Sequence, residues 1–240
     1  MAPRLVDSHC HLDSFKRKQM EELPQDILPV TSGYSHKSNK KTVEIAKSLK
    51  IPFCLGIAPQ TAVFDGIEKL PEWEEFIQAQ NPNAIGEIGL DYHWGKEEKH
   101  FSDEAALFGR MLDLADGMGL PIVLHTRKAE DKVLDALEKY GWKKPFMMHF
   151  FSGEAETAKR AVKMGGIISI PPLHSKDRRK TIESVPLEKL VSETDAPYIT
   201  RGIEGVRDAI QYIAEVKNIT FEKAAEATAR NSATFFNFDL

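Results

Sequence analysis

Eight short apolar runs, spread along the whole chain, are the feature that most constrains how this sequence can fold. They are rich in β-branched residues and are hydrophobic at consecutive positions rather than at alternate ones. Such runs are typical of parallel strands covered on both faces, whereas half-exposed antiparallel strands alternate apolar and polar residues. The runs predict parallel strands at Leu5–His11, Ile27–Gly33, Phe53–Ala58, Ala84–Leu90, Ile122–Thr126, Phe146–Phe151, Ile167–Ile170 and Leu190–Asp195.

Segments with helical periodicity follow these runs and often end at Gly or Pro. Helices are expected at Thr42–Leu49, Glu72–Gln80, Phe101–Met118, Ala129–Tyr140, Ala155–Met164, Arg178–Ser184, Ile203–Lys217 and Thr220–Ala229. Eight strand–helix units in 240 residues have roughly the length of the repeat in a closed (β/α)8 barrel. A doubly wound open sheet would show the same alternation, so the pattern alone leaves both folds open.

Composition places the chain among ordinary globular proteins. Hydrophobic residues make up 42% and charged residues 28%, and no apolar stretch reaches the roughly 18 residues that span a bilayer. The N-terminus lacks the long apolar core of a signal peptide, so we expect a cytoplasmic protein. A net charge of −4 argues against a surface that attracts nucleic acid everywhere, but it is compatible with a local basic rim.

Two histidines separated by one residue close the first predicted strand. Because side chains alternate along a strand, His9 and His11 face the same side. A His-x-His pair at the end of an apolar strand favours a metal site. The alternative is a hydrogen-bonded pair of histidines at the mouth of a barrel.

Four further residues of metal-ligating type lie within, or close, other predicted strands: Glu87, His125, His149 and Asp195. An unpartnered charge or imidazole in a buried strand is costly, so a shared partner is the economical explanation. In a closed parallel barrel the carboxyl ends of all strands meet at one rim. We therefore expect four histidines and two carboxylates to face one cavity in a single-domain α/β (β/α)8 TIM barrel that spans residues 1–240.

Six ligands exceed the three or four that one zinc ion takes from a protein. Two divalent ions about 3.5–4 Å apart, with a carboxylate between them, fit the number better. Glu87, flanked by apolar residues, is the predicted bridge, and Asp195, at a strand end, is the predicted ligand and general base. Mixed nitrogen and oxygen ligands suit zinc, manganese or magnesium, which leaves the metal open.

Several motifs, in order along nearly the whole chain, resemble the signatures of the TatD family of metal-dependent deoxyribonucleases, in the amidohydrolase-like superfamily. They are Asp7–Asp13 (DSHCHLD), Gly86–Tyr92 (GEIGLDY), Leu120–Pro121 leading to His125–Arg127 (HTR), His149–Gly153 (HFFSG), Glu193–Tyr198 (ETDAPY), and Asn231 with Phe235. The resemblance implies a (β/α)8 fold, two divalent ions and hydrolysis of DNA phosphodiester bonds. It also implies a first ion held by His9, His11, Glu87 and Asp195, and a second held by Glu87, His125 and His149.

The sequence departs from the family pattern in three places. The segment Gly56–Gln60 reads GIAPQ where the family has Gly-x-His-Pro, so a histidine thought to face the substrate phosphate is absent. Lys128 follows Arg127 where an acidic residue is usual, and the segment after Asp195 is short.

The expected activity is hydrolysis of DNA by a metal-activated water, with Asp195, Glu87 and Arg127 in the catalytic roles. Arg127 lies two residues after His125 and could bind a phosphate oxygen, although a salt bridge at the rim is the alternative. One competing interpretation is an amidohydrolase-type enzyme acting on a small ester, lactone or phosphoester. Another is a barrel that binds metal or nucleic acid without turnover. DNA is the expected partner; no membrane or protein partner is predicted, and the oligomeric state stays open.

Overall fold

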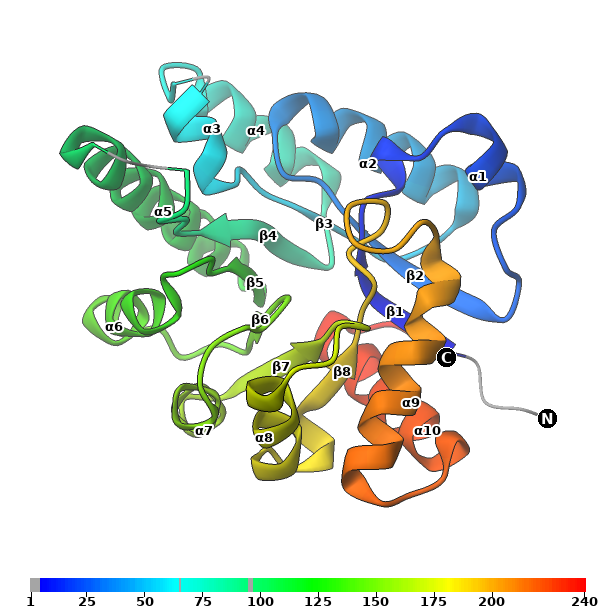
Figure 1. Cartoon of the computed structure of the whole chain (residues 1–240). Coiled ribbons are helices and arrows are strands. Elements are labelled where there is room, and N and C mark those ends of the chain that lie inside the picture. The colour runs from blue at the N-terminus through cyan, green and yellow to red at the C-terminus, as the bar shows by residue number, and fades with distance from the viewer. Residues whose placement is uncertain (1–4, 65, 95–96) are drawn as a thin grey trace.

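Eight parallel strands form a single sheet in the computed structural model, which describes residues 5–64, 66–94 and 97–240 (Figure 1). Each strand pairs in parallel with the next one along the chain. The strands are β1 (Leu5–Cys10), β2 (Ile27–Ser32), β3 (Phe53–Leu55), β4 (Ala84–Gly89), β5 (Ile122–His125), β6 (Phe146–Met148), β7 (Gly166–Ile170) and β8 (Leu190–Ser192).

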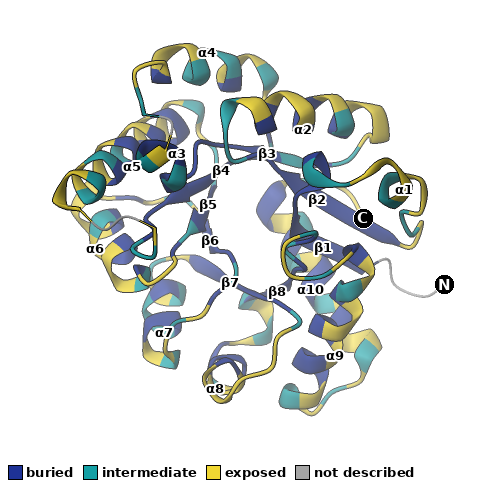
Figure 2. Cartoon of the chain, turned by 45° about the horizontal axis from the view of Figure 1, so that its top comes forward, coloured by how far each residue is buried: buried dark blue, intermediate teal, exposed yellow. Residues whose placement is uncertain are grey.

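Backbone hydrogen bonds at the carboxyl ends of β1 and β8 join the first strand to the last. The N–H of Asp195 donates to the carbonyl of His9 at 3.0 Å, and the N–H of His11 donates to the carbonyl of Ala196 at 2.7 Å. Figure 2 shows the resulting ring of strands inside a ring of helices. The predicted (β/α)8 barrel is confirmed, and the open doubly wound sheet is excluded.

Helices connect the strands and cover the outside of the barrel. They are α1 (Arg17–Glu21), α2 (His36–Leu49), α3 (Pro59–Phe64), α4 (Leu70–Gln80), α5 (Glu98–Met118), α6 (Glu130–Tyr140), α7 (Ala155–Lys163), α8 (Lys176–Ser184), α9 (Val206–Lys217) and α10 (Phe221–Phe236). Short 3-10 turns lie at Leu12–Ser14, Leu187–Lys189 and Ile203–Gly205. Among the described residues, no helix has the length and apolar character needed to cross a bilayer.

Two helix boundaries differ clearly from the prediction. α2 begins at His36 rather than Thr42, because the side chain of Ser35 caps it by accepting a hydrogen bond from the N–H of Ser38. α10 continues past Ala229 to Phe236, and the short helices α1 and α3 were not predicted. α1 and α3 are too short, and α1 is too polar, to show clear hydrophobic periodicity.

Three strands end earlier than their apolar runs suggest, at Leu55, Met148 and Ser192. After β6 the backbone of Phe150 has φ 47°, and after β8 that of Asp195 has φ 51°. This left-handed conformation cannot continue a strand. The chain therefore leaves the sheet within a few residues of the barrel rim, where it delivers polar side chains.

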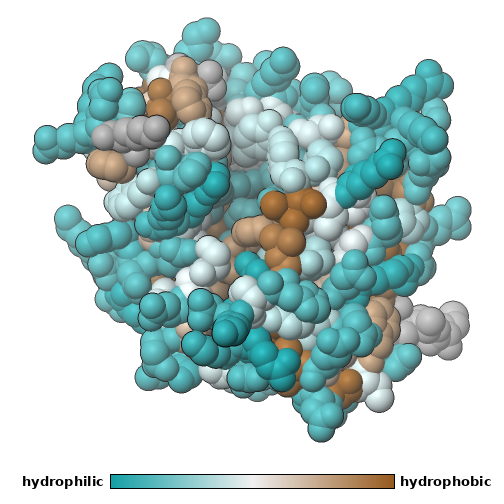
Figure 3. Space-filling model, in the orientation of Figure 1, coloured by the Kyte–Doolittle hydropathy of each residue, from teal (hydrophilic) through white to brown (hydrophobic). Residues whose placement is uncertain are grey.

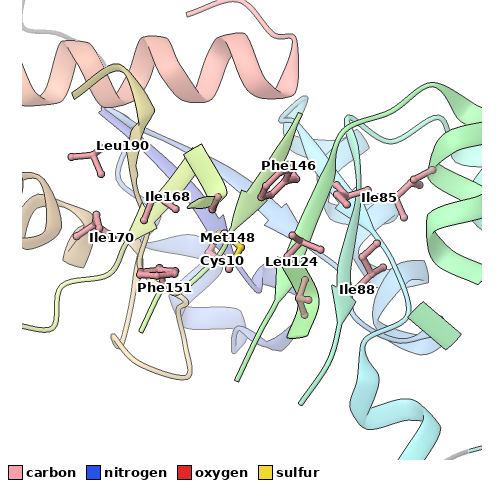
Figure 4. Close-up of a cluster of buried hydrophobic side chains, with 14 of the residues drawn as sticks. Cys10, Ile85, Ile88, Leu124, Phe146, Met148, Phe151, Ile168, Ile170 and Leu190 are labelled. Carbon is pink, nitrogen blue, oxygen red and sulfur yellow. The ribbon is translucent and has the colours of Figure 1, made fainter. Parts of the chain in front are cut away.

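Hydrophobic side chains form two packed layers beneath a mostly hydrophilic surface (Figure 3). The larger cluster lies between strands and helices, and Figure 4 shows part of it, including Ile85, Leu124 and Phe146. The smaller cluster draws on all eight strands and on α10, as expected for the inside of the barrel. Its members are Val6, Leu28, Val30, Cys54, Ala84, Val123, Met147, Ile167, Val191, Ala229, Phe235 and Phe236.

Candidate metal centre

All six predicted ligand residues converge at the carboxyl ends of the strands. They come from β1 (His9 and, one residue beyond it, His11), β4 (Glu87), β5 (His125), the first position after β6 (His149) and the third position after β8 (Asp195). Five of them, together with Tyr34, Gln60 and Tyr198, line a cavity of about 240 Å³. His9 is fully buried and reaches the same cluster from below through its contact with Glu87.

Glu87 stands between two pairs of histidines. Its Oε1 lies 3.2 Å from Nε2 of His9 and 2.9 Å from Nε2 of His11. Its Oε2 lies 3.3 Å from Nδ1 of His125 and 3.5 Å from Nε2 of His149. The two oxygens of one carboxylate therefore face different pairs of ring nitrogens. Irregularities in the pairing of β1 and of β4, beside His9 and Glu87, help to aim these side chains.

Asp195 completes the group on the side of His9 and His11. Its Oδ1 lies 3.2 Å from Nε2 of His11 and 3.8 Å from Nε2 of His9. Its side chain is 15% exposed, compared with 6% for Glu87. Asp195 is thus the carboxylate of this group that is more open to the cavity.

Each histidine points its second ring nitrogen away from Glu87, toward a fixed protein group. Nδ1 of His11 lies 2.9 Å from the carbonyl oxygen of Ser32, and Nδ1 of His9 lies 3.3 Å from Oγ of the same residue. Because the carbonyl can only accept, Nδ1 of His11 carries a proton, and Nε2 is the nitrogen that faces the cluster.

The other two histidines contact carboxylates in the same way. Nε2 of His125 lies 2.8 Å from Oδ2 of Asp91, and Nδ1 of His149 lies 3.5 Å from Oε1 of Glu193. Glu193 is fully buried, and the hydroxyl of Ser169 donates to its other oxygen at 2.5 Å. A carboxylate behind an imidazole fixes the ring orientation and makes the free nitrogen a stronger ligand.

The pKa shifts of Glu87 and His9 suit a cation. Burial works to lower the pKa of His11, His125 and His149, but the neighbouring carboxylates raise it, so a bound cation would displace protons from these three rings. Burial works to raise the pKa of Glu87, but the nearby charges of His11 and His149 hold it well below its usual value. Burial, and then the proximity of His149, lower the pKa of His9. The bridging position therefore carries a negative charge at neutral pH, and a neutral imidazole lies beside it.

Sequence analysis missed the groups that hold the histidines, and it missed the contribution of Gln60 to the cavity wall. Asp91 and Glu193 lie inside the quoted motifs, Asp91 just after one predicted strand and Glu193 within another, but spacing alone does not distinguish a ligand from its support. Gln60 lies two residues after Ala58, the position where the family pattern has the histidine. Its Nε2 is 3.3 Å from Oδ2 of Asp91 and 3.4 Å from Nε2 of His125, so an amide occupies this wall of the cavity.

Arg127 does not join the central group. It is exposed at the rim and lines a second, adjoining cavity, with its guanidinium carbon 5.7 Å from the ring centre of Trp94. Tyr92 is partly buried and packs edge-on against Phe101, as expected for a packing role rather than for a binding one.

The donor set fits divalent cations. Within the part of the chain that the structure describes, three groups place their ligand atoms within 4.8 Å of one another: His9, His11 and Glu87; Glu87, His125 and His149; and His9, His149 and Asp195. Oε1 of Glu87 is buried and accepts no well-aligned hydrogen bond from the described residues, and only ring nitrogens of His9 and His11 approach it, at 3.2 and 2.9 Å. A buried, ionised oxygen without a donor is costly unless a cation is bound near it. Glu87 belongs to two of the three groups, as a residue shared by two ions would.

Comparisons with known proteins agree with this site. The family model described as TatD related DNase matches residues 6–237. An uncharacterized metal-dependent hydrolase of Methanocaldococcus jannaschii is 31% identical over 251 residues, which cover 97% of each chain. A Danio rerio protein named "Putative deoxyribonuclease tatdn3" is 26% identical over 265 residues, covering 99% of this chain and 98% of that one.

Solved structures show the same relationship. A crystal structure of a TatD homologue from Escherichia coli K12 superposes with a TM-score of 0.84 at 25% identity and covers 100% of both chains. The match includes every strand that carries a residue of the centre. With a family model over nearly its whole length and a cluster of metal-ligating side chains at the barrel rim, this chain belongs to the TatD family of metal-dependent hydrolases.

Proposed function

We propose that this protein is a two-metal phosphodiesterase that hydrolyses DNA. The observation that carries the proposal is the position of Glu87, whose two oxygens face separate histidine pairs. In the proposed site the first ion is held by His9, His11, Glu87 and Asp195, and the second by Glu87, His125 and His149. When bound, two divalent cations acidify a water and offset negative charge on the phosphoryl oxygens.

Asp195 is the proposed proton acceptor. Burial tends to raise its pKa, but the hydrogen bond and charge of His11 and the charges of His149 and His9 lower it below the usual value. The carboxylate is therefore ionised at neutral pH, and it is more open to the cavity than Glu87. A general base must reach the proton that it removes, and Asp195 meets that requirement at the cavity wall.

Arg127 is the proposed phosphate contact. It lines the adjoining cavity together with His125, His149 and Asp195, so an ester placed at the metal centre would extend toward it. A guanidinium offers a planar fork of N–H donors that matches two phosphate oxygens. Its cation–π contact with Trp94 holds the head group at the rim without neutralising its charge.

The choice of DNA rests on two kinds of support: the family model described as TatD related DNase, and the Danio rerio relative, whose name describes a deoxyribonuclease. The absent histidine at Ala58 and the net charge of −4 make the substrate the part of the proposal that most needs a direct test.

The test compares substrates on one preparation loaded with zinc, manganese or magnesium in turn. Single-stranded DNA, duplex DNA, RNA, bis(p-nitrophenyl) phosphate and p-nitrophenyl acetate are each incubated with wild type and with Glu87→Gln. We expect cleavage of DNA and of the phosphodiester, and loss of both in the variant. Cleavage of the acetate alone would assign the site to small esters. Two bound ions with no turnover of any substrate would make the chain a binding protein.

A further inference from the structure

A second cavity of about 330 Å³ opens directly beside the metal centre. The two cavities share His125, His149, Asp195 and Tyr198. Beyond these, the second one is lined by Thr126, Arg127, Phe150, Ser152 and Ile199. A substrate whose reacting bond lies at Glu87 would therefore place the group next to that bond in the second cavity, which has a different lining.

Phe150 is an aromatic residue among those that line this space. Phe150 directly follows His149, and the centres of the two rings are 6.2 Å apart. Its backbone has φ 47°, a left-handed conformation that is uncommon for a residue with a bulky side chain. Strained residues of this kind persist where the surrounding structure fixes them, and they concentrate at binding and catalytic sites.

Arg178 of α8 fixes Phe150 from one side. This arginine is only 8% exposed, and its guanidinium carbon lies 5.8 Å from the centre of the Phe150 ring. Its Nη1 donates to the carbonyl of Leu173 at 2.5 Å, and its Nη2 donates to the carbonyl of Phe151 at 3.3 Å. The loops after β6 and β7 are thus joined, and the ring is held in place before any ligand arrives.

Exposed apolar side chains lie at the mouth of the same cavity. Tyr198 is 55% exposed and Ile199 is 40% exposed, both on the segment that follows Asp195. Figure 3 shows a hydrophobic patch surrounded by hydrophilic surface on the face toward which, in Figure 1, the loop after β8 projects. Exposed apolar groups beside a polar catalytic centre are typical of a ligand-binding surface.

We propose that the second cavity binds a planar aromatic group adjacent to the scissile ester, and that this group stacks on Phe150. The inference rests on the proposed function in that it places the ester at Glu87; in a DNA substrate the planar group is a nucleobase. Aromatic side chains stack on any base, because every base presents a π-face. The cavity therefore selects for the presence of a flat ring rather than for one base over another.

A binding experiment tests this without relying on turnover. Thymidine 5′-monophosphate and deoxyribose 5-phosphate carry the same phosphate and sugar, but only the first has a base. Titration calorimetry on the metal-loaded protein measures both dissociation constants. We expect the nucleotide to bind about 5- to 160-fold more tightly, the range that one stacked base contributes.

Variants assign this preference to Phe150. Phe150→Ala should weaken binding of the nucleotide toward that of the sugar phosphate, with the sugar phosphate unchanged, and Phe150→Tyr should restore the preference. Phe64→Ala removes the same atoms from an aromatic residue of α3 that is 65% exposed and outside the cavity lining; it should have no effect. If Phe150→Ala does not fold, Ile199→Ser probes the same cavity from its mouth and should also weaken the nucleotide alone.

The outcomes separate this inference from the proposed function. Equal affinity of the wild-type protein for the two phosphates, or an equal loss of both in Phe150→Ala, overturns the stacking site. A protein that prefers the nucleotide but cleaves no phosphodiester keeps the stacking site and loses the nuclease assignment. A protein that cleaves DNA but binds the two phosphates equally keeps the nuclease assignment and loses the stacking site.

Discussion

The two ends of the barrel are both buried, but they are built from opposite kinds of residue. At the carboxyl end, four histidines and two carboxylates lie within 4 Å of a neighbour in the same group. At the amino end, Phe235 and Phe236 of α10 pack with side chains from every strand, and the amide of Asn83, just before β4, donates to the carbonyl of Phe236 at 2.9 Å.

The difference shows how one fold separates chemistry from stability. Apolar packing lowers the free energy of the folded chain without any ligand. Clustered imidazoles and carboxylates raise that free energy until a cation satisfies them. Changes at the amino end should therefore alter stability alone, and changes at the carboxyl end should alter metal binding and hydrolysis.

The largest effect is expected for Glu87→Gln. The amide loses the charge that both proposed ions share, so bound divalent metal should fall from two ions to one or none, and hydrolysis should fall with it. Elemental analysis of gently purified protein measures the metal, and circular dichroism checks the fold. An unchanged metal content would remove the bridging role of Glu87.

Asp195→Asn, also at the carboxyl end of the barrel, should separate catalysis from metal binding. The amide keeps the size and one ligating oxygen but abolishes basicity, so most of the metal should remain. Loss of a general base typically slows a reaction by about 10²- to 10⁴-fold. The loss of one negative charge from the ligand set would slow it further. Near-wild-type phosphodiesterase activity with both ions bound would assign the proton to another group.

Phe236→Ala tests the amino end. Removing a fully buried aromatic side chain should lower the free energy of unfolding by about 3–5 kcal/mol. Urea denaturation after treatment with a chelator measures this without a contribution from bound metal. Phe64→Ala, at a position that is 65% exposed, serves as the control and should change stability little. Metal content per folded molecule should be unaltered, and a loss of metal would contradict the separation of the two ends.

The smallest effect is expected at the support of a ligand. Glu193→Gln keeps the shape but removes the charge beside Nδ1 of His149, which should weaken binding of the second ion by about 10- to 100-fold. Competition against a coloured chelator measures the affinity. Glu188→Gln, on the exposed turn before β8, provides a nearby change of the same chemistry and should leave the affinity unaltered.

The sequence predicted the strands and the polar residues they carry, because both depend on local pattern. Continuous apolar runs mark strands covered on both faces, and a histidine or carboxylate within such a run is conspicuous. The convergence of His9, Glu87 and His149 then follows from barrel topology, which brings all strand ends to one rim.

The parts that sequence analysis did not supply depend on contacts between distant residues. That Asp91 supports His125, or that Glu193 lies behind His149, requires the positions of two strands relative to each other. The early ends of β6 and β8 follow from the backbone at Phe150 and Asp195, where tertiary contacts impose a conformation that the apolar pattern does not reveal. The contribution of Phe150 to the second cavity was missed for the same reason.

The closure between β1 and β8 has a consequence for the order of events during synthesis. His9 is made long before Asp195, but the carbonyl that it presents is bonded only when Asp195 has been added. A nascent chain grows from its N-terminus, and domains fold as they become complete. A growing chain can therefore present five of the six clustered side chains and still lack the strand that closes the ring. Assembly of the proposed metal centre would report that synthesis has passed the eighth strand.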